Sequence, residues 1–423
     1  MAGSVAGNMA VGGLRALGRG ERPRFRDLLL TPGNMRRIAD DLARMRGAAM
    51  KLGQLISMDT GEVLPPELSE ILARLRADAD FMPPAQLKRV LNAAWGEGWL
   101  GQFRSFDTRP IAAASIGQVH RAKLRDGRDL AIKVQYPGIA RSIDSDVSNL
   151  GALLSVSGLL PQDFEIKPYL AEARRQLHEE ADFLREGACL AQFGDLLRDD
   201  PDFVVPERHE DWTTGTVLAM SFVASEPIEA TLELPQEARD RIAELLIRLL
   251  LRELFEFGFM QTDPNFANYR YQPETDRILL LDFGATRSFG VEIVKQYRRL
   301  FSAGLTDDRQ ALEEIVEAIG FIAPDTLLRH RQAVIGMIRL VFQAISRDRV
   351  FDFGPQELSK DMNVAGEALA ADGFLPPPVP MDALYLQRKF GGIFLLAHRL
   401  QARVAITDLI AEAISQPKAK SGF

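Results

Sequence analysis

Cysteine is nearly absent from this chain of 423 residues, which contains only Cys189. A single cysteine excludes a disulfide framework and a metal site made of several thiolates. The five histidines are scattered rather than paired at ligand spacing, which argues against a zinc site. The sequence also lacks a run of about 20 apolar residues, the length that spans a bilayer. The uncharged stretch Met1–Leu14 lacks a preceding basic region and a leucine-rich stretch. We therefore expect no secretory signal peptide and a cytoplasmic location.

Charge is unevenly distributed along the chain. The net charge is −7, but residues 1–51 contain ten basic and four acidic side chains. A basic arm on an acidic body suggests contact with an anionic lipid surface or nucleic acid, although a solvated arm is equally compatible with the charge alone. Phe25 is the only aromatic residue of the arm, which argues against nucleic acid because single strands are bound by stacking on aromatic side chains.

The periodicity of apolar residues changes from helical to strand-like and back, which predicts an α+β fold. Helices are expected over 34–58, after Pro65–Pro66, from Pro84, and over 139–155, 167–198 and 236–258. Strands are expected over Pro110–Ala122, Leu130–Gln135, 203–205 and 215–223, with a short hairpin around Pro273–Arg277. From 291 onward the pattern is helical, interrupted at Pro376–Pro380. We therefore expect three domains, with bounds 1–107, 108–223 and 224–423.

Two polar motifs stand close together in the third of these segments. The apolar run Leu279–Leu281 leads into Asp282-Phe283-Gly284, where an aspartate at a strand end is well placed to hold Mg²⁺ against ATP phosphates. Upstream, Asp263 and Asn268 have the spacing of a kinase catalytic loop. Either motif alone is weak evidence, but the pair separated by a hairpin is much stronger. The alternative is a capped turn rich in Asp and Asn.

Lys133 ends the strand Leu130-Ala131-Ile132-Lys133, which matches the strand that carries the phosphate-binding lysine of kinases. A lone strand lysine is more often a solvated edge residue. Its apolar neighbours favour an inward side chain, which then needs a carboxylate partner. The helix predicted over 167–198 offers three candidates, which are Glu180, Asp182 and Glu186.

The loop before this strand is rich in alanine where kinases have glycine. Residues 111–118 read Ile-Ala-Ala-Ala-Ser-Ile-Gly-Gln. Alanine has a Cβ and resists the positive φ angles that let a glycine-rich backbone wrap a phosphate. We therefore expect this loop to hold a nucleotide differently from the loop of a protein kinase.

Five motifs in order resemble the UbiB/ADCK/Coq8 family of atypical protein-kinase-like (ABC1/AarF-type) proteins, with the closest likeness to the eukaryotic-type coenzyme Q members. They are the alanine-rich loop, Lys51-Leu52-Gly53-Gln54, Glu180-Ala181-Asp182, the segment 261–268 (QTDPNFAN) and the segment 280–287 (LLDFGATR). The likeness runs from about Arg44 into the C-terminal region. It implies a two-lobed kinase-like fold with an N-terminal helical extension packed over the cleft.

The resemblance also implies roles for individual residues. Lys133 pairs with Glu186, Asp263 is the catalytic-loop aspartate, and Asn268 and Asp282 are metal ligands. The nucleotide is bound by Lys133 and by Ala112, Ala113, Ala114, Ser115 and Ile116. Lys51, Gln54, Glu180 and Asp182 gate the cleft. Without the family, Lys51–Gln54 would be interpreted as a helix kink, and Glu180 and Asp182 as exposed helix acids.

The function implied is an ATPase that uses ATP, ADP and Mg²⁺ and supports coenzyme Q biosynthesis. If the extension occludes the cleft, water rather than a peptide reaches the γ-phosphate. The expected partners are anionic membrane lipids, isoprenoid quinone precursors and ubiquinone-biosynthesis enzymes, at the cytoplasmic face of the inner membrane and without nucleic acid. Two alternatives stay open, namely a phosphotransferase acting on a protein or small molecule and a non-catalytic ATP-binding scaffold. The sequence leaves the oligomeric state open.

Overall fold

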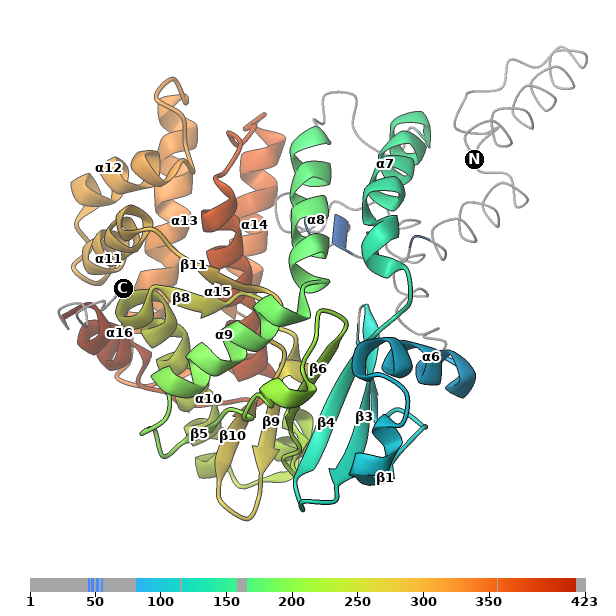
Figure 1. The fold of residues 1–423 in the computed structure, drawn as a ribbon. Helices are drawn as coiled ribbons and strands as arrows, with labels where there is room; N and C mark the ends of the chain where they lie inside the picture. The colour runs from blue at the N-terminus through green and yellow to red at the C-terminus, as the bar shows by residue number, and fades with distance from the viewer. Residues whose placement is uncertain are drawn as a thin grey trace, which may run out of the picture. The chain divides into compact units, whose positions relative to one another are not determined.

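The computed structural model describes residues 81–114, 116–157, 166–355 and 357–415, together with six positions between 45 and 55. The predicted helix after Pro65–Pro66 lies outside these residues, and so do the site candidates Gln54 and Ser115. Within the predicted helix over 34–58, the described residues from Gly47 to Leu55 are helical. The chain divides into two compact units: unit 1 is Met1–Ala188 with Glu207–Phe222, and unit 2 is Cys189–Pro206 with Val223–Phe423. Figure 1 labels their helices and strands.

Unit 1 is built on an antiparallel sheet whose strands run in the order β1-β3-β4-β6, with β2 paired to β3. The predicted strand–turn–strand hairpin is confirmed as β3 and β4, which are joined through the turn at Gly127, where φ is +102°. The strands are β1 (Phe103–Phe106), β2 (Ala112–Ala113), β3 (Gly117–Leu124), β4 (Asp129–Gln135) and β6 (Val217–Ser221).

One face of this sheet forms the core of unit 1 with the first described helix. Leu130, Ile132 and Val134 alternate along β4 and are fully buried, as the period of two in a strand requires. Leu87 and Leu91 of helix α6 (Pro84–Trp95) belong to the same cluster. The helix expected from Pro84 is therefore confirmed. Two short 3₁₀ helices complete this side, η1 (Trp99–Gln102) and η2 (Glu210–Trp212).

The single helix predicted over 167–198 is wrong, because the chain breaks between α8 (Lys167–Glu180) and α9 (Phe183–Leu196). At the break, the Asp182 side chain accepts a hydrogen bond from the backbone N–H of Arg185 at 3.0 Å, which caps the new helix. Gln135 donates to the carbonyl of Ala181 at 2.8 Å and ties the break to the end of β4. The helix expected over 139–155 is confirmed as α7 (Ile139–Ser157).

Unit 2 combines small sheets with many helices. The predicted hairpin around Pro273–Arg277 is confirmed, since β9 pairs with β10 in a sheet of order β5-β10-β9-β7, and β8 pairs with β11. These strands are β5 (Phe203–Val204), β7 (Glu226–Pro227), β8 (Phe259–Gln261), β9 (Tyr269–Gln272), β10 (Arg277–Leu280) and β11 (Thr286–Ser288). The 3₁₀ helices are η3 (Ile228–Glu233) and η5 (Phe266–Asn268).

The helical pattern expected in the rest of unit 2 is also present. Helix α10 (Gln236–Arg252) continues into a π-helical turn, η4 (Glu253–Phe257). The later helices are α11 (Val291–Leu305), α12 (Arg309–Ile319), α13 (Leu328–Ser346), α14 (Glu357–Ala371), α15 (Met381–Arg399) and α16 (Ile406–Ser415), with a strand pair β12 (Phe351–Asp352) and β13 (Arg403–Val404). Among the described residues, no helix combines the length and apolar character needed to cross a membrane.

Candidate functional site

Lys133 and Glu186 form a buried ion pair in unit 1. The Lys133 amine donates to both carboxylate oxygens of Glu186, at 2.7 and 2.9 Å. The two side chains are only 8% and 2% exposed, so the alternative of a solvated edge lysine does not hold. The ring of Phe183 lies 5.3 Å from the amine and adds a cation–π contact. Of the three acids considered for Lys133, Glu186 is the partner because the break at Asp182 places it in the first turn of α9.

A second ion pair in unit 1 joins Lys51 to Glu180 at the end of α8. Both side chains are largely buried. Lys51 is therefore not a solvated residue at a helix kink, and Glu180 is not an exposed helix acid. Asp182 is exposed, and its described contact is the cap on α9. It therefore orients the helix that carries Glu186.

The alanine-rich segment is a tight backbone hairpin at one edge of the unit 1 sheet. Ala112 and Ala113 form β2 and are exposed, and the N–H of Ala114 donates to the carbonyl of Gly117 at 2.8 Å. The Ile116 side chain is buried in unit 1, so it has no exposed surface for a ligand. A Cβ at Gly117 would lie 2.4 Å from the Val134 carbonyl oxygen, so only glycine fits there. A ligand at this segment would meet alanine methyl groups and backbone.

Asp263 and Asn268 lie together in unit 2, as their spacing predicts. The Asn268 amide nitrogen donates to the backbone carbonyl of Asp263 at 3.2 Å and to its carboxylate oxygen Oδ2 at 3.1 Å. The loop also contains a capped turn, since Asn265 accepts a hydrogen bond from the N–H of Ala267 at 3.1 Å. The loop therefore contains both the capped turn and the contact between Asp263 and Asn268.

Asp282 follows β10 in an unusual backbone conformation. Its φ is +58°, in the left-handed region that aspartate tolerates better than most residues but at a cost. The carboxylate accepts from the N–H of Gly284 at 3.1 Å, which stabilises this turn. The N–H of Leu281 donates to the carbonyl of Asn268 at 2.8 Å, and Gln261 donates to the carbonyl of Asp282 at 3.3 Å. These bonds tie the Asp282 turn to the loop of Asp263.

The donor chemistry of Asn268 and Asp282 fits Mg²⁺. Magnesium prefers oxygen ligands and binds through one or two protein groups, with water and substrate phosphates as its remaining ligands. Because Asn268 uses its amide nitrogen toward Asp263, its amide oxygen remains as a donor for a cation. The carboxylate of Asp282 supplies the negative charge.

Helix α15 contributes two residues that the sequence reasoning missed. Arg388 donates to the Asp263 carboxylate oxygen Oδ1 at 2.6 Å. Its neighbour Lys389 donates to the backbone carbonyl of Gln261 at 2.6 Å and to the hydroxyl of Tyr269 at 2.8 Å. A Cβ at Gly392 would lie 2.2 Å from the Cβ of Pro264, so the helix packs closely on this loop.

Lys389 is buried, and its charge is balanced within the protein. The Glu253 carboxylate of the π-helical turn lies 3.3 Å from its amine. Burial alone would lower the pKa of Lys389, but the nearby Glu253 and Tyr269 outweigh this effect, so the pKa lies above its usual value. The ammonium therefore stays charged and fixes the end of β8, where the catalytic-loop segment begins. A lysine in register with buried Leu386 and Ile393 is the sequence signal that could have indicated this role.

Residues 74–316 match the family described as the ABC1 atypical kinase-like domain. The chain belongs to this family. The resemblance to UbiB/ADCK/Coq8 proteins is thereby confirmed.

Curated relatives match over most of this chain. It is 37% identical to "Atypical kinase COQ8, mitochondrial" of Saccharomyces cerevisiae, over 97% of this chain and 82% of that protein. It is 38% identical to "Atypical kinase COQ8B, mitochondrial" of Rattus norvegicus, over 90% of this chain and 72% of that protein. The Caenorhabditis elegans protein "Atypical kinase coq-8, mitochondrial" is 37% identical, and the match spans about half of its length, 51%.

A solved structure supports the fold class. A Mycobacterium tuberculosis protein, determined in complex with erythromycin, resembles this chain with a TM-score of 0.65 and 25% identity, over 88% of this chain and 93% of that one. The predicted α+β, protein-kinase-like fold is therefore confirmed.

Proposed function

We propose that this chain is a Mg-dependent ATPase in which Lys133 contacts the phosphates of ATP and Glu186 holds Lys133 in place. The observation that carries the proposal is the buried pair of Lys133 with both oxygens of Glu186, the arrangement on which phosphate positioning in kinases depends. In unit 2, Asn268 and Asp282 offer the oxygen ligands for Mg²⁺. The bound ion would neutralise charge on the phosphates.

The surroundings of Asp263 favour water as the acceptor of the phosphoryl group. In kinases the corresponding aspartate receives the hydroxyl of the substrate. Here Oδ1 already accepts from Arg388 at 2.6 Å and Oδ2 from Asn268 at 3.1 Å. Each oxygen therefore already has one donor beside it, which leaves less room at the carboxylate for a bulky hydroxyl acceptor than for a water molecule. We therefore propose that phosphate goes mainly to water.

The biological setting is proposed from the family. The relatives are named as atypical kinases COQ8 and COQ8B, and the motifs resemble coenzyme Q proteins. We propose that ATP hydrolysis supports coenzyme Q biosynthesis by acting on isoprenoid quinone precursors at the surface of the inner membrane. Anionic lipids and ubiquinone-biosynthesis enzymes are the proposed partners.

A phosphate balance tests the ATPase directly. Purified chain is incubated with Mg²⁺ and ATP labelled at the γ-phosphate, and free phosphate is compared with label on protein and on small molecules. Free phosphate should account for most of the label. Transfer that exceeds free phosphate would instead establish a phosphotransferase, and tight ATP binding without turnover would establish a scaffold.

Lys51→Ala should change how the protein uses nucleotides. The substitution removes the partner of the largely buried Glu180 and weakens the contact between the helical residues around Lys51 and α8. We expect the ratio of ATP to ADP affinity to change about tenfold, which corresponds to about 1.4 kcal/mol, or label to appear on the protein itself. Nucleotide titrations and label incorporation measure the two effects. Lys88→Ala, at an exposed position of α6, is the matched control. A Lys51→Ala protein indistinguishable from wild type would exclude a gating role.

Anionic liposomes should raise the rate of phosphate release. Each basic residue near an anionic surface contributes about 1 kcal/mol of attraction, and residues 1–51 have ten of them. The increase should shrink at high salt because salt screens the attraction. Replacing Arg15, Arg19, Arg22, Arg24 and Arg26 by glutamine should reduce it. Equal stimulation by uncharged liposomes would show that the basic arm has no part in it.

A further inference from the structure

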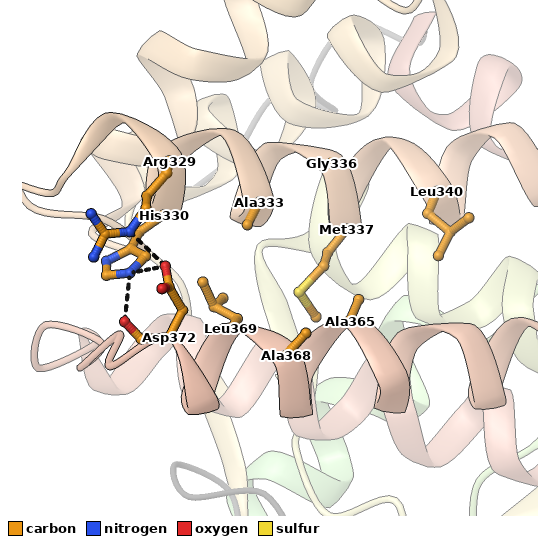
Figure 2. Close-up of a pocket in the computed structure, with 10 residues that line it drawn as sticks. All are labelled: Arg329, His330, Ala333, Gly336, Met337, Leu340, Ala365, Ala368, Leu369 and Asp372. Atoms are coloured by element: carbon orange, nitrogen blue, oxygen red, sulfur yellow. Dashed lines mark hydrogen bonds and ion pairs between the residues drawn. The ribbon is translucent and has the colours of Figure 1, made fainter.

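Helices α13 and α14 of unit 2 leave an open groove between them (Figure 2). Its volume is about 430 Å³, which lies within the range of small-molecule sites. Along the whole length of α14, no residue is buried. The helix is therefore loosely packed on this side, and a ligand can enter without disrupting a core.

The lining of the groove is apolar except at one end. Small and flexible apolar side chains form its length: Ala333, Gly336, Met337 and Leu340 from α13, and Ala365, Ala368 and Leu369 from α14. At the other end from Leu340, Arg329 donates to the Asp372 carboxylate at 2.6 Å, and the buried His330 lies 2.9 Å from the same carboxylate. The charges of Arg329 and Asp372 cancel. The groove thus offers one polar end without net charge from this ion pair. Its apolar path from Ala333 to Leu340 is about 10 Å long, from the rise per helical residue.

Exposed leucines flank this polar end. Leu327 and Leu328 directly precede Arg329 and are 52% and 67% exposed, and Leu375 lies three residues after Asp372 and is 87% exposed. Large apolar side chains gathered on a surface mark contact sites for apolar partners. A molecule that leaves a membrane at these leucines would meet the polar end of the groove.

We propose that this groove binds the apolar chain of a neutral lipid, with a hydroxyl or carbonyl head group at Arg329, His330 and Asp372. An apolar path that ends at a hydrogen-bonding ion pair without net charge complements a molecule with an apolar chain and one neutral polar head group. An ionised head would face an ion pair that already satisfies its own charges. The inference deepens the proposed function by giving the lipid substrate class a site, and it rests on that function only for its biological meaning.

The test measures dodecanol binding to the purified full chain by equilibrium dialysis, without nucleotide. Gly336→Leu places a side chain in the groove, and a Cβ at Gly336 meets no atom within 4 Å, so the fold should be kept. We expect at least tenfold weaker dodecanol binding with an unchanged or higher melting temperature, since glycine is a poor helix residue. Ala370→Leu adds a similar side chain at an exposed α14 position outside the lining and should bind as wild type.

The polar end is tested by exchanging the head group and the charge. Wild type should prefer dodecanol to dodecanoate, and Asp372→Asn, which leaves Arg329 without its counter-charge, should prefer dodecanoate. Non-saturable dodecanol binding, equal binding by Gly336→Leu, or a wild-type preference for dodecanoate would overturn the site. The dialysis contains no ATP, so its result is independent of the phosphate-release assay. A chain that binds dodecanol but hydrolyses no ATP would refute the proposed ATPase and leave the groove standing. A chain that hydrolyses ATP but does not bind dodecanol would refute the groove and leave the proposed ATPase standing.

Discussion

Asp282→Asn should abolish Mg-dependent nucleotide binding while the protein stays folded. Asparagine adopts the left-handed conformation that Asp282 occupies at φ +58°, and its side-chain oxygen can still accept from the N–H of Gly284. What is lost is the negative charge that Mg²⁺ requires in its oxygen ligand set. We expect Mg-ATP affinity to fall at least a hundredfold, about 2.7 kcal/mol. The thermal shift produced by Mg-ATP, measured against ATP with a chelator, reports the loss.

Asp276→Asn provides a matched control for this experiment. Asp276 also has a positive φ, 54°, and accepts from the Tyr271 hydroxyl at 2.9 Å in the turn between β9 and β10. It has no assigned role with the nucleotide, so its variant should show the wild-type thermal shift. An unchanged shift in Asp282→Asn would refute the assignment of Asp282 as a metal ligand.

Breaking the pair of Lys133 and Glu186 should cost both stability and nucleotide binding. Glu186→Leu leaves an ammonium in a site where the lysine side chain is only 8% exposed, and removing one partner of a buried ion pair costs about 3–5 kcal/mol. Mg-ATP binding should also fall below detection, because Lys133 is no longer held toward the phosphates. Urea unfolding and nucleotide titration measure the two losses separately.

A double variant separates the structural role of the pair from its functional one. Replacing both partners, as Lys133→Met with Glu186→Leu, also removes the buried ammonium, and apolar replacements of buried pairs are often neutral or stabilising. We expect most of the free energy of unfolding to return while nucleotide binding stays absent. A double variant that binds Mg-ATP like the wild type would show that the pair serves the fold alone.

The sequence predicted those parts of the fold and site that depend on neighbouring residues. The hairpin of β3 and β4 followed from alternating apolar residues around Asp126-Gly127, and the turns after β8 and β10 followed from short motifs. The spacing of Asp263 and Asn268 is local too, and the structure brings their side chains into contact. Such features need no knowledge of distant contacts.

The choice of Glu186 needed information that the local pattern lacks. An apolar pattern continuous over 167–198 predicts one helix, in which Glu180, Asp182 and Glu186 are equal candidates. The break arises from a tertiary bond, Gln135 to the carbonyl of Ala181, together with the Asp182 cap. After the break, Glu186 lies in the first turn of α9 and contacts Lys133. The residues alone did not decide which carboxylate pairs with Lys133, and only the family resemblance favoured Glu186.

The contact of Arg388 could not be found from spacing at all. Arg388 contacts Asp263 across 125 positions of the chain. Arginine is by far the commoner basic residue here, so one more arginine on a helix carries no signal. Lys389 was more accessible to reasoning, because lysine is scarce in this sequence and rarely stands on a buried face.

Phosphate release from Mg-ATP by the purified chain, with and without liposomes that carry a phenolic quinone-precursor mimic, tests the proposed ATPase most directly. We expect release that depends on Mg²⁺, increases with the mimic and disappears in Asp282→Asn. Release that continues at the wild-type rate in Asp282→Asn, or none from the wild type under any of these conditions, would contradict a Mg-ATPase built on these residues.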